Sequence, residues 1–310
     1  MYYNALIDSC QRACICTSSA AIGHDDGVPA LPNFTTLADR AAAIDGVDPL
    51  SETSRLALRH ATPTYIVTDD AGRYTGGAVI GDDGATEIVV DPNYRSRGCG
   101  RRLVQAVLSE RPNARLWAHN DLPAAQHLAR QLGLTVVRNL WRMTHPANSV
   151  PLITNPVVPK GFSTRSFIVG KDEDTWLAVN AHAFVHHPEQ GRMTHADLEE
   201  RMAESWFDPT GLLLIEDDAT GALAASHWTK VEPESLDGEA YVVAVDPDYQ
   251  GRGLGRTVTS LGLAHLKSVG VQSISLYVEN NNTPAIATYT RLGFTRNGVD
   301  VMYATPDSAQ

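Results

Sequence analysis

Residues 88–100 read IVVDPNYRSRGCG and residues 243–255 read VAVDPDYQGRGLG. Asp91 and Asp246 stand 246 − 91 = 155 residues apart, half of the 310-residue chain. Two copies of one segment at this spacing indicate a duplicated domain. In each copy a run of small and branched apolar residues predicts a strand, Asp-Pro ends it, and a basic glycine-rich turn opens a helix.

The repeated turn is suited to binding an anion. Its glycines let the backbone bend sharply and approach a ligand closely, and the N-terminus of the following helix presents unpaired N–H groups. The turn has neither the Lys-Ser/Thr ending of a P-loop nor the three-glycine spacing of a dinucleotide fingerprint. We therefore predict two phosphate-binding turns, the first cradle (residues 95–100) and the second cradle (residues 250–256). The alternative is a plain tight turn between strand and helix.

Similar elements are predicted around both copies. In the second half they are strand 162–168, helices 173–185 and 194–204, strands 211–216, 221–230 and 239–246, helix 253–269, strand 272–279, helix 283–292 and strand 294–303. This order predicts an α+β fold class with two tandem domains, each a mixed, mostly antiparallel sheet flanked by helices. We place the domains at residues 33–146 and 161–305, joined by a proline-rich linker, 147–160, and preceded by a flexible extension, 1–32.

Composition excludes several classes of function. The net charge of −11 argues against a nucleic-acid partner, and no apolar stretch approaches the ~20 residues that span a bilayer. Cys10, Cys14 and Cys16 have a poor spacing for zinc and do not suggest a disulfide framework. We therefore expect a monomeric cytoplasmic protein with no metal and no membrane or nucleic-acid partner.

Other segments extend the pattern beyond the two turns. They are DGVDPLSE (45–52), HHPEQG (186–191), ESWFDPTGLLL (204–214), HWTKVEP (227–233), EAYVVAVDP (239–247) and LYVENNNTPAIATYTRLGF (276–294). With the glycine-rich turns they resemble the GNAT superfamily of acyl-CoA N-acyltransferases and, within it, the tandem mycothiol synthase family, over about residues 33–304. The resemblance implies acetyl-CoA as co-substrate. It also implies acetyl transfer to the cysteinyl amine of a glucosaminyl-inositol pseudodisaccharide, the last step of mycothiol biosynthesis.

The resemblance also implies the site residues. In the second half the acetyl-CoA positions are Val243, Ala244, Val245, Gln250, Gly251, Arg252, Gly253, Leu254, Gly255, Arg256, Asn282, Thr283, Pro284, Ala285, Ile286 and Ala287. In the first half they are Ile88, Val89, Val90, Arg95, Ser96, Arg97, Gly98, Cys99 and Gly100. The substrate positions are Glu52, Glu189, Lys230, Glu239 and Tyr277. For Glu189 and Lys230, solvated salt bridges are the alternative.

Two residues are candidates for proton transfer. An α-amino group titrates near pH ~8, so a base must deprotonate it at neutral pH. We assign Glu239 as this base, acting through a water, and strand periodicity predicts its side chain on the same face as Val243 and Val245. Tyr289 is the candidate acid for the departing thiolate. The alternatives are a strand glutamate paired with a cation and a packing tyrosine.

The first half does not repeat this pair. The 155-residue offset puts Gly84 where Glu239 stands, and after the loop an offset of 293 − 133 = 160 puts Ala129 at the position of Tyr289. We expect the N-terminal domain to bind acetyl-CoA or support the fold without catalysis, and Glu52 to reach its neighbour's substrate pocket.

Two other functions stay open at this point. One is a tandem GNAT enzyme that acetylates another amine, such as an aminoglycoside or a protein N-terminus. The other is a non-catalytic acyl-CoA-binding protein, against which the presence of both Glu239 and Tyr289 argues.

Overall fold

The computed structural model of the chain describes residues 15–18 (backbone only), 34–59, 65–68, 74–81, 84–147, 156–185 and 190–308. Our expectations for the N-terminal extension, for most of the linker and for Glu189 fall outside these residues.

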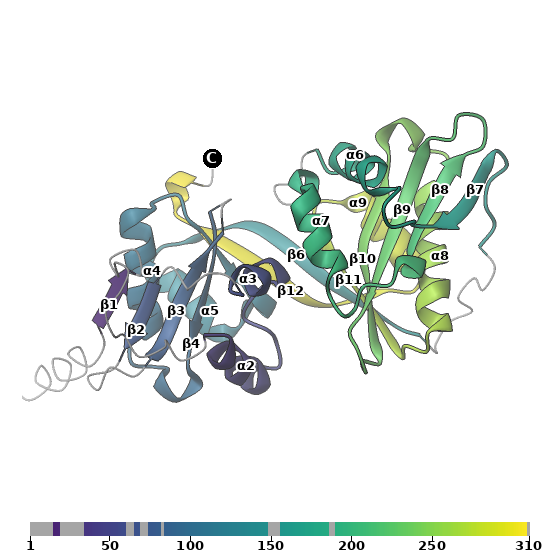
Figure 1. Cartoon of the computed structure of the whole chain (residues 1–310). Helices are drawn as coiled ribbons and strands as arrows, with labels where there is room; N and C mark the ends of the chain where they lie inside the picture. The colour runs from purple at the N-terminus through teal and green to yellow at the C-terminus, as the bar shows by residue number, and fades with distance from the viewer. Residues whose placement is uncertain are drawn as a thin grey trace, which may run out of the picture. The chain divides into compact units, whose positions relative to one another are not determined.

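The chain folds into two compact units (Figure 1). Unit 1 comprises Met1–Asn139 and Val299–Gln310, and unit 2 comprises Leu140–Gly298. Each combines a mixed sheet with helices on both faces, which confirms the predicted α+β class with two domains.

Unit 1 has the strand order β1-β2-β3-β4-β5-β12. Its strands are β1 (Ile15–Ser18), β2 (Tyr65–Thr68), β3 (Tyr74–Ile80), β4 (Ala85–Val90), β5 (Arg115–Ala118) and β12 (Thr295–Ala304), and its helices are α2 (Phe34–Asp45), α3 (Glu52–Ala57), α4 (Cys99–Glu110) and α5 (Pro123–Gln131). The β4–β5 pair is parallel and the other pairs are antiparallel.

The two faces of this sheet carry separate cores. Leu103 and Val107 of α4 pack with Leu116 of β5, whereas Leu37 of α2 packs with Val89 of β4. Alternation along the strands therefore supplies apolar side chains to both faces, because successive residues of a strand point to opposite sides.

Unit 2 has the strand order β6-β11-β10-β9-β8-β7. Its strands are β6 (Thr135–Pro146), β7 (Phe162–Ser166), β8 (Leu212–Asp217), β9 (Leu223–Val231), β10 (Asp237–Val245) and β11 (Ser273–Glu279), and its helices are α6 (Glu173–Ala183), α7 (His195–Met202), α8 (Leu254–Ser268) and α9 (Thr283–Arg291). The β10–β11 pair is parallel and the other pairs are antiparallel.

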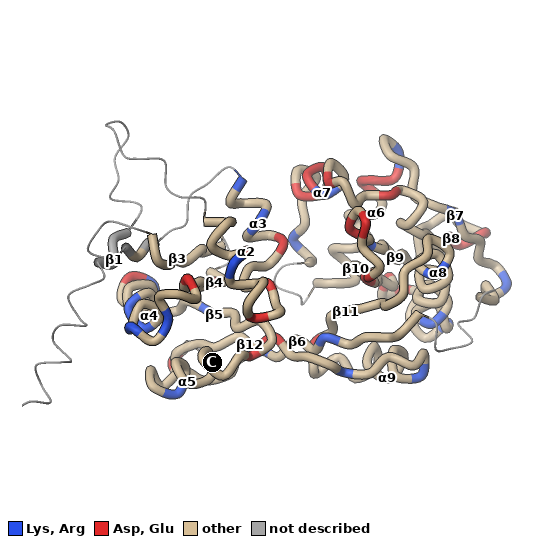
Figure 2. Tube along the Cα trace, turned by 90° about the horizontal axis from the view of Figure 1, so that it is seen from below, with Lys and Arg blue, Asp and Glu red and all other residues tan. Residues whose placement is uncertain are grey.

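One face of this sheet packs against α8 and α9, and the other against α6 and α7. Leu263 of α8 and Tyr289 of α9 share a core with Ala240 of β10. Trp176 of α6 and Leu198 of α7 share another with Val242. Figure 2 shows acidic positions along α7, which carries Asp197, Glu199 and Glu200.

The last strand of each repeat completes the sheet of the other unit. β6 follows α5 in sequence but pairs with β11 over Leu140–Pro146, and β12 follows α9 but pairs with β5 over Val301–Tyr303. The observed units therefore differ from the predicted ranges 33–146 and 161–305 at these two strands. Both strands come from equivalent places in the repeat, so the local pattern does not tell which sheet each one joins.

Among the described residues, the helices are too short or too polar to cross a membrane.

Candidate active site

Strands β10 and β11 pair at their first residues and then separate. Within the described residues 190–308, their ladder joins Asp237–Glu239 to Ser273–Ser275 and covers no later pair. Beyond this ladder, β10 remains paired with β9, and Val243 lies opposite His227. The backbone of residues 243–245 therefore has one edge turned toward the opening between the two strands, where it can pair with an extended ligand.

The second cradle closes one end of this opening. Gly251 and Gly253 adopt φ of +76° and +81°, a left-handed conformation that favours glycine. Gly253 is the N-cap of α8 and makes no side-chain cap, so the first N–H groups of this 15-residue helix face the turn. The Arg252 guanidinium carbon lies 4.8 Å from the Tyr249 ring centroid, which holds that cation beside the turn.

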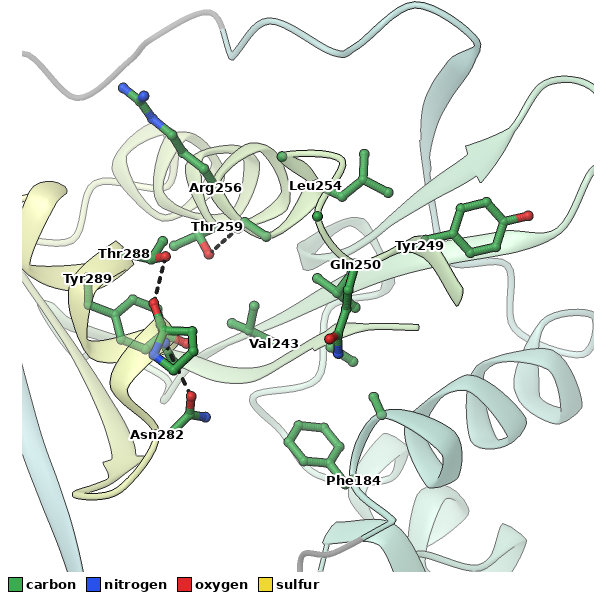
Figure 3. Close-up of a pocket in the computed structure, with 18 residues that line it drawn as sticks. Phe184, Val243, Tyr249, Gln250, Leu254, Arg256, Thr259, Asn282, Thr288 and Tyr289 are labelled. Atoms are coloured by element: carbon green, nitrogen blue, oxygen red, sulfur yellow. Dashed lines mark hydrogen bonds between the residues drawn. The ribbon is translucent and has the colours of Figure 1, made fainter. Parts of the chain in front are cut away.

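A cavity of about 580 Å³ joins the second cradle to α9 (Figure 3). Its lining includes most of the predicted acetyl-CoA positions of the second half: Val243, Ala244, Val245, Gln250, Gly251, Gly253, Leu254, Gly255, Arg256, Asn282, Pro284 and Ala285. The other four predicted positions do not line it: Arg252, Thr283, Ile286 and Ala287.

Five lining residues were not predicted: Ala183, Phe184, Tyr249, Thr259 and Thr288. Helical spacing could have pointed to Thr288, four residues after the predicted Pro284, and to Thr259, four residues after Gly255. Ala183 and Phe184 come from the end of α6, far away in the sequence, and no local signal marks them.

Tyr289 lies at the α9 side of the same cavity. Its side chain is 8% exposed, and its ring centroid is 5.9 Å from that of Phe294. Burial raises the pKa of the Tyr289 phenol to about 12. The phenol therefore keeps its proton at neutral pH, as a proton donor must.

Glu239 lies on the opposite face of the sheet from the one we predicted. The β9–β10 register shifts between Ala240 and Val242, so that Tyr241 is an extra residue on β10. The bulge changes the phase of the strand. Glu239 lies opposite Lys230 and Val242 opposite Trp228, so these side chains share the α6/α7 face.

Val243 packs instead with the α8 and α9 residues. The prediction that Glu239 shares a face with Val243 and Val245 was wrong because strand periodicity holds only between bulges. Glu239 is half-buried at the last rung of the β10–β11 ladder, where the strands begin to separate.

The described substrate candidates lie on different elements. Lys230 of β9 has a side chain that is 14% exposed, and its Nζ lies 3.0 Å from Glu232 Oε1. Tyr277 of β11 is 43% exposed. Glu52 is the first residue of α3 in unit 1 and is half-buried. Lys230 is thus the candidate that the structure puts directly beside Glu239.

The first cradle repeats the backbone geometry but not the surroundings. Gly98 has φ of +79° and Ser96 has φ of +61°, close to their counterparts in the second cradle. However, Arg95 makes a two-pronged ion pair with Asp45 at 2.6 and 2.7 Å and donates to the carbonyl of Val90. The Arg95 guanidinium is therefore already paired with groups of its own unit. The equivalent residue in the second cradle is Gln250, which has no charge.

The remaining first-half positions follow the predicted pattern of turn and strand. Ile88 and Val90 pack on the α4 side and Val89 on the α2 side. Cys99 is 1% exposed at the start of α4, and Arg97 lies over the Tyr94 ring at 5.0 Å.

The end of α6 carries a histidine that pairs with the end of β10. His182 Nδ1 lies 3.1 Å from Asp246 Oδ2, and with Asp248 these residues place three donor atoms within 4.8 Å of one another. The hydrogen bond to Asp246 by itself accounts for the position of the imidazole, so this group does not argue for a metal.

Comparison with known proteins gives matches in both halves. The acetyltransferase (GNAT) family model matches residues 178–294, and an acetyltransferase (GNAT) domain model matches residues 61–135. A GCN5-related N-acetyltransferase from Sphaerobacter thermophilus has the same fold, with a TM-score of 0.65, 21% identity and 94% of each chain covered. A tandem GNAT protein from the clavulanic acid biosynthesis pathway also has a TM-score of 0.65, with 18% identity over 87% of this chain and 94% of that one.

The curated sequence relatives have a much higher identity to this chain than these solved structures have. The mycothiol acetyltransferase of Kytococcus sedentarius is 47% identical over 87% of this chain and 92% of its own length. The one from Thermobispora bispora is 48% identical over 86% and 93%, and the one from Streptomyces coelicolor is 44% identical over 87% and 89%.

Proposed function

Because the chain belongs to the mycothiol acetyltransferase family, we propose that its unit 2 transfers acetyl from acetyl-CoA to the cysteinyl amine of the glucosaminyl-inositol pseudodisaccharide. The protein is an acetyltransferase of the GNAT type that acts in mycothiol biosynthesis. The observation that best supports the proposal is the cavity that runs from the second cradle along the open edge of β10 to Tyr289.

The cavity fits an extended thioester carrier with a pyrophosphate at one end. The N–H groups at the start of α8 and the Arg256 side chain suit the pyrophosphate. The backbone of residues 243–245 suits the amide groups of a pantetheine arm, because its edge toward β11 is open. This arrangement directs the acetyl group toward Tyr289.

The amine approaches from the α6/α7 face. Acidic positions on α7 favour a cationic acceptor on this side. Glu239 takes a proton from the ammonium through a water, which leaves the nitrogen lone pair free to attack the thioester carbonyl. Backbone N–H groups near Val243 stabilise the resulting oxyanion.

Tyr289 then donates its phenolic proton to the thiolate that leaves as the carbon–sulfur bond breaks. Base and acid thus act from the two faces of the sheet and meet where β10 and β11 separate. In this arrangement, the bulge at Tyr241 puts the base and the acid on different sides of the reacting bond.

Unit 1 has a supporting role in this proposal. Its first cradle keeps the turn that suits a pyrophosphate, but Gly84 and Ala129 replace the two proton-transfer residues. We assign Glu52, Glu189 and Tyr277, with Lys230, to acceptor binding. We also assign the protein to the cytoplasm as a monomer with no metal and no membrane partner. The net charge of −11 supports the further assignment that it has no nucleic-acid partner.

Turnover with two acceptors tests the acceptor assignment. The protein should release CoA from acetyl-CoA in the presence of the cysteinyl pseudodisaccharide and not in the presence of an aminoglycoside. Turnover with the aminoglycoside alone would overturn the assignment, and binding of acetyl-CoA without any turnover would favour the non-catalytic reading.

Glu239→Gln tests the base. The amide cannot accept the proton, so kcat should fall by ~10²–10⁴-fold while KM for acetyl-CoA changes little. Glu234→Gln, an exposed glutamate in the loop between β9 and β10, is the matched control and should keep the wild-type rate. An unchanged kcat in Glu239→Gln would remove this residue from the base role.

A further inference from the structure

A lysine ammonium lies against two aromatic rings on the α6/α7 face of unit 2. Lys230 Nζ is 4.8 Å from the ring centroid of Trp206 and 5.7 Å from that of Tyr241. Both distances lie within the ~6 Å over which a cation is attracted to a ring face. We call Trp206 and Tyr241 the aromatic clamp.

Neighbouring side chains pack against the two rings of the clamp and hold them in place. The centroids of Trp206 and Tyr241 are 5.2 Å apart, and Trp228 packs on both rings at 5.6 and 5.3 Å. The buried Arg201 donates from Nε to the Tyr241 hydroxyl at 3.0 Å and from Nη1 to the Asp197 carbonyl at 2.9 Å. Tyr241 is also the bulge residue of β10, so the bulge that turns Glu239 to this face supplies one ring of the clamp.

The clamp acts on a long side chain that Glu232 also contacts, with Lys230 Nζ 3.0 Å from Glu232 Oε1. Lysine has a four-carbon stem with several rotatable bonds, so an unrestrained ammonium samples a large volume. Lys230 lies directly opposite Glu239 across the β9–β10 ladder. Fixing its ammonium therefore keeps a hydrogen-bond donor at the register position next to the proposed general base and on the same face of the sheet, a pairing that suits a polyhydroxylated acceptor.

We infer that Trp206 and Tyr241 are positioning residues that hold the Lys230 ammonium beside Glu239 for acceptor binding. The inference rests on the proposed function for the identity of the acceptor. Without this role, the ring cluster would serve core packing alone. The cavity of the second cradle includes none of Trp206, Lys230 and Tyr241, so the clamp should act on the acceptor and not on acetyl-CoA.

Kinetics of Trp206→Leu give the first test. KM for the pseudodisaccharide should rise about 5- to 30-fold, the equivalent of one cation–ring interaction, with KM for acetyl-CoA unchanged. Trp206→Phe keeps a ring and should restore most of the loss. Trp176→Leu removes another buried ring that packs on Trp228 at 5.3 Å, so it controls for damage to the core.

A double-mutant cycle separates positioning from packing. Lys230→Met keeps the apolar stem and removes the charge, so Trp206→Leu should cause no further rise in KM in that background. Independent effects of the two substitutions would overturn the inference. If Trp206→Leu does not fold, Trp206→Phe replaces it in the cycle, with a smaller expected coupling of the same sign.

Spectroscopy tests the clamp without any turnover. The chain has four lysines, so the ε-methylene signals can be assigned by substitution. Ring currents should move the Lys230 signal upfield of the other three, and Trp206→Leu should return it to their range. An unshifted signal in the wild type would overturn the inference. Absent turnover with a shifted signal would instead count against the proposed function.

Discussion

Burial keeps the Tyr289 phenol in its protonated form. The phenol is nearly inaccessible, and its pKa rises to about 12 because burial disfavours the phenolate. Its ionisation is thus outside the range of ordinary assays. A limb of the pH–rate profile near neutrality therefore belongs to another group, such as the acceptor amine.

Tyr289→Phe tests this assignment. The variant keeps the ring packing against Phe294 but has no proton to give, so kcat should fall by about 10²–10⁴-fold. Tyr303→Phe is the matched control, because burial also raises the pKa of the Tyr303 phenol to about 12 but the residue lies in unit 1. Its kcat should match the wild type. Equal rates for the wild type and Tyr289→Phe would leave Tyr289 as a packing residue.

At the scale of one element, the strand–turn–helix unit occurs twice, with the same backbone geometry but different surroundings. Gly98 and Gly253 have φ of +79° and +81° at the start of α4 and α8, so the backbone design is the same. The surroundings separate them, because Arg95 pairs with Asp45 in the first copy. The same turn therefore stands in different surroundings in the two units.

Gly253→Ala and Gly98→Ala form a matched pair of tests. A Cβ would meet no atom within 4 Å at either position, so the cost comes from the left-handed backbone, about 1–2 kcal/mol. We expect both variants to lose similar stability in urea unfolding. Only Gly253→Ala should raise KM for acetyl-CoA, and an equal rise in both would contradict a single catalytic cradle.

At the scale of the whole molecule, the exchanged strands tie distant parts of the sequence together. Asp300 of β12 belongs to unit 1 although it follows all of unit 2 in sequence. There, His119 bridges two carboxylates, with Nδ1 3.0 Å from Asp300 and Nε2 3.0 Å from Glu87. Glu87 also accepts from the backbone N–H of Ser51, the N-cap of α3. One imidazolium thus fastens the last strand to β4 and to the start of α3.

This bridge predicts a pH-dependent stability. Burial opposes the charge on His119, but the hydrogen bonds to Asp300 and Glu87 outweigh it and raise the His119 pKa to about 10, from about 6.5 in the unfolded chain. A raised folded-state pKa stabilises fully below pH ~6.5, and the contribution is lost as the pH rises through about 10. The free-energy difference between wild type and His119→Asn in urea unfolding should therefore be larger at pH 7 than at pH 10.

The matched control for this prediction is His195→Asn. His195 is also paired with a carboxylate, Asp174, but both side chains are largely exposed, so solvent screens the pair. Its substitution should change stability little at either pH. A wild-type advantage over His119→Asn that stays constant between pH 7 and pH 10 would mean that the bridge is not ionic.

Several parts of the site were accessible to sequence reasoning because they are local. The duplicated turn, the glycines at positive φ and the helix start follow from neighbouring residues, and the structure has them at the expected positions. Residues supplied by another element, such as Phe184 of α6 in the cavity, were missed because no nearby pattern marks them.

The amino-acid pattern alone was enough to predict the two-domain α+β architecture, the position of both cradles, and Gly84 and Ala129 at the first-half positions that correspond to Glu239 and Tyr289. These depend on periodicity and on single residues whose effect is local. Three features became visible only in the folded chain: the bulge at Tyr241 turns Glu239 to the α6/α7 face, Arg95 pairs with Asp45, and β6 and β12 exchange sheets. Each of these depends on pairing between segments far apart in sequence, where the free energy of packing, and not the local pattern, selects the partner.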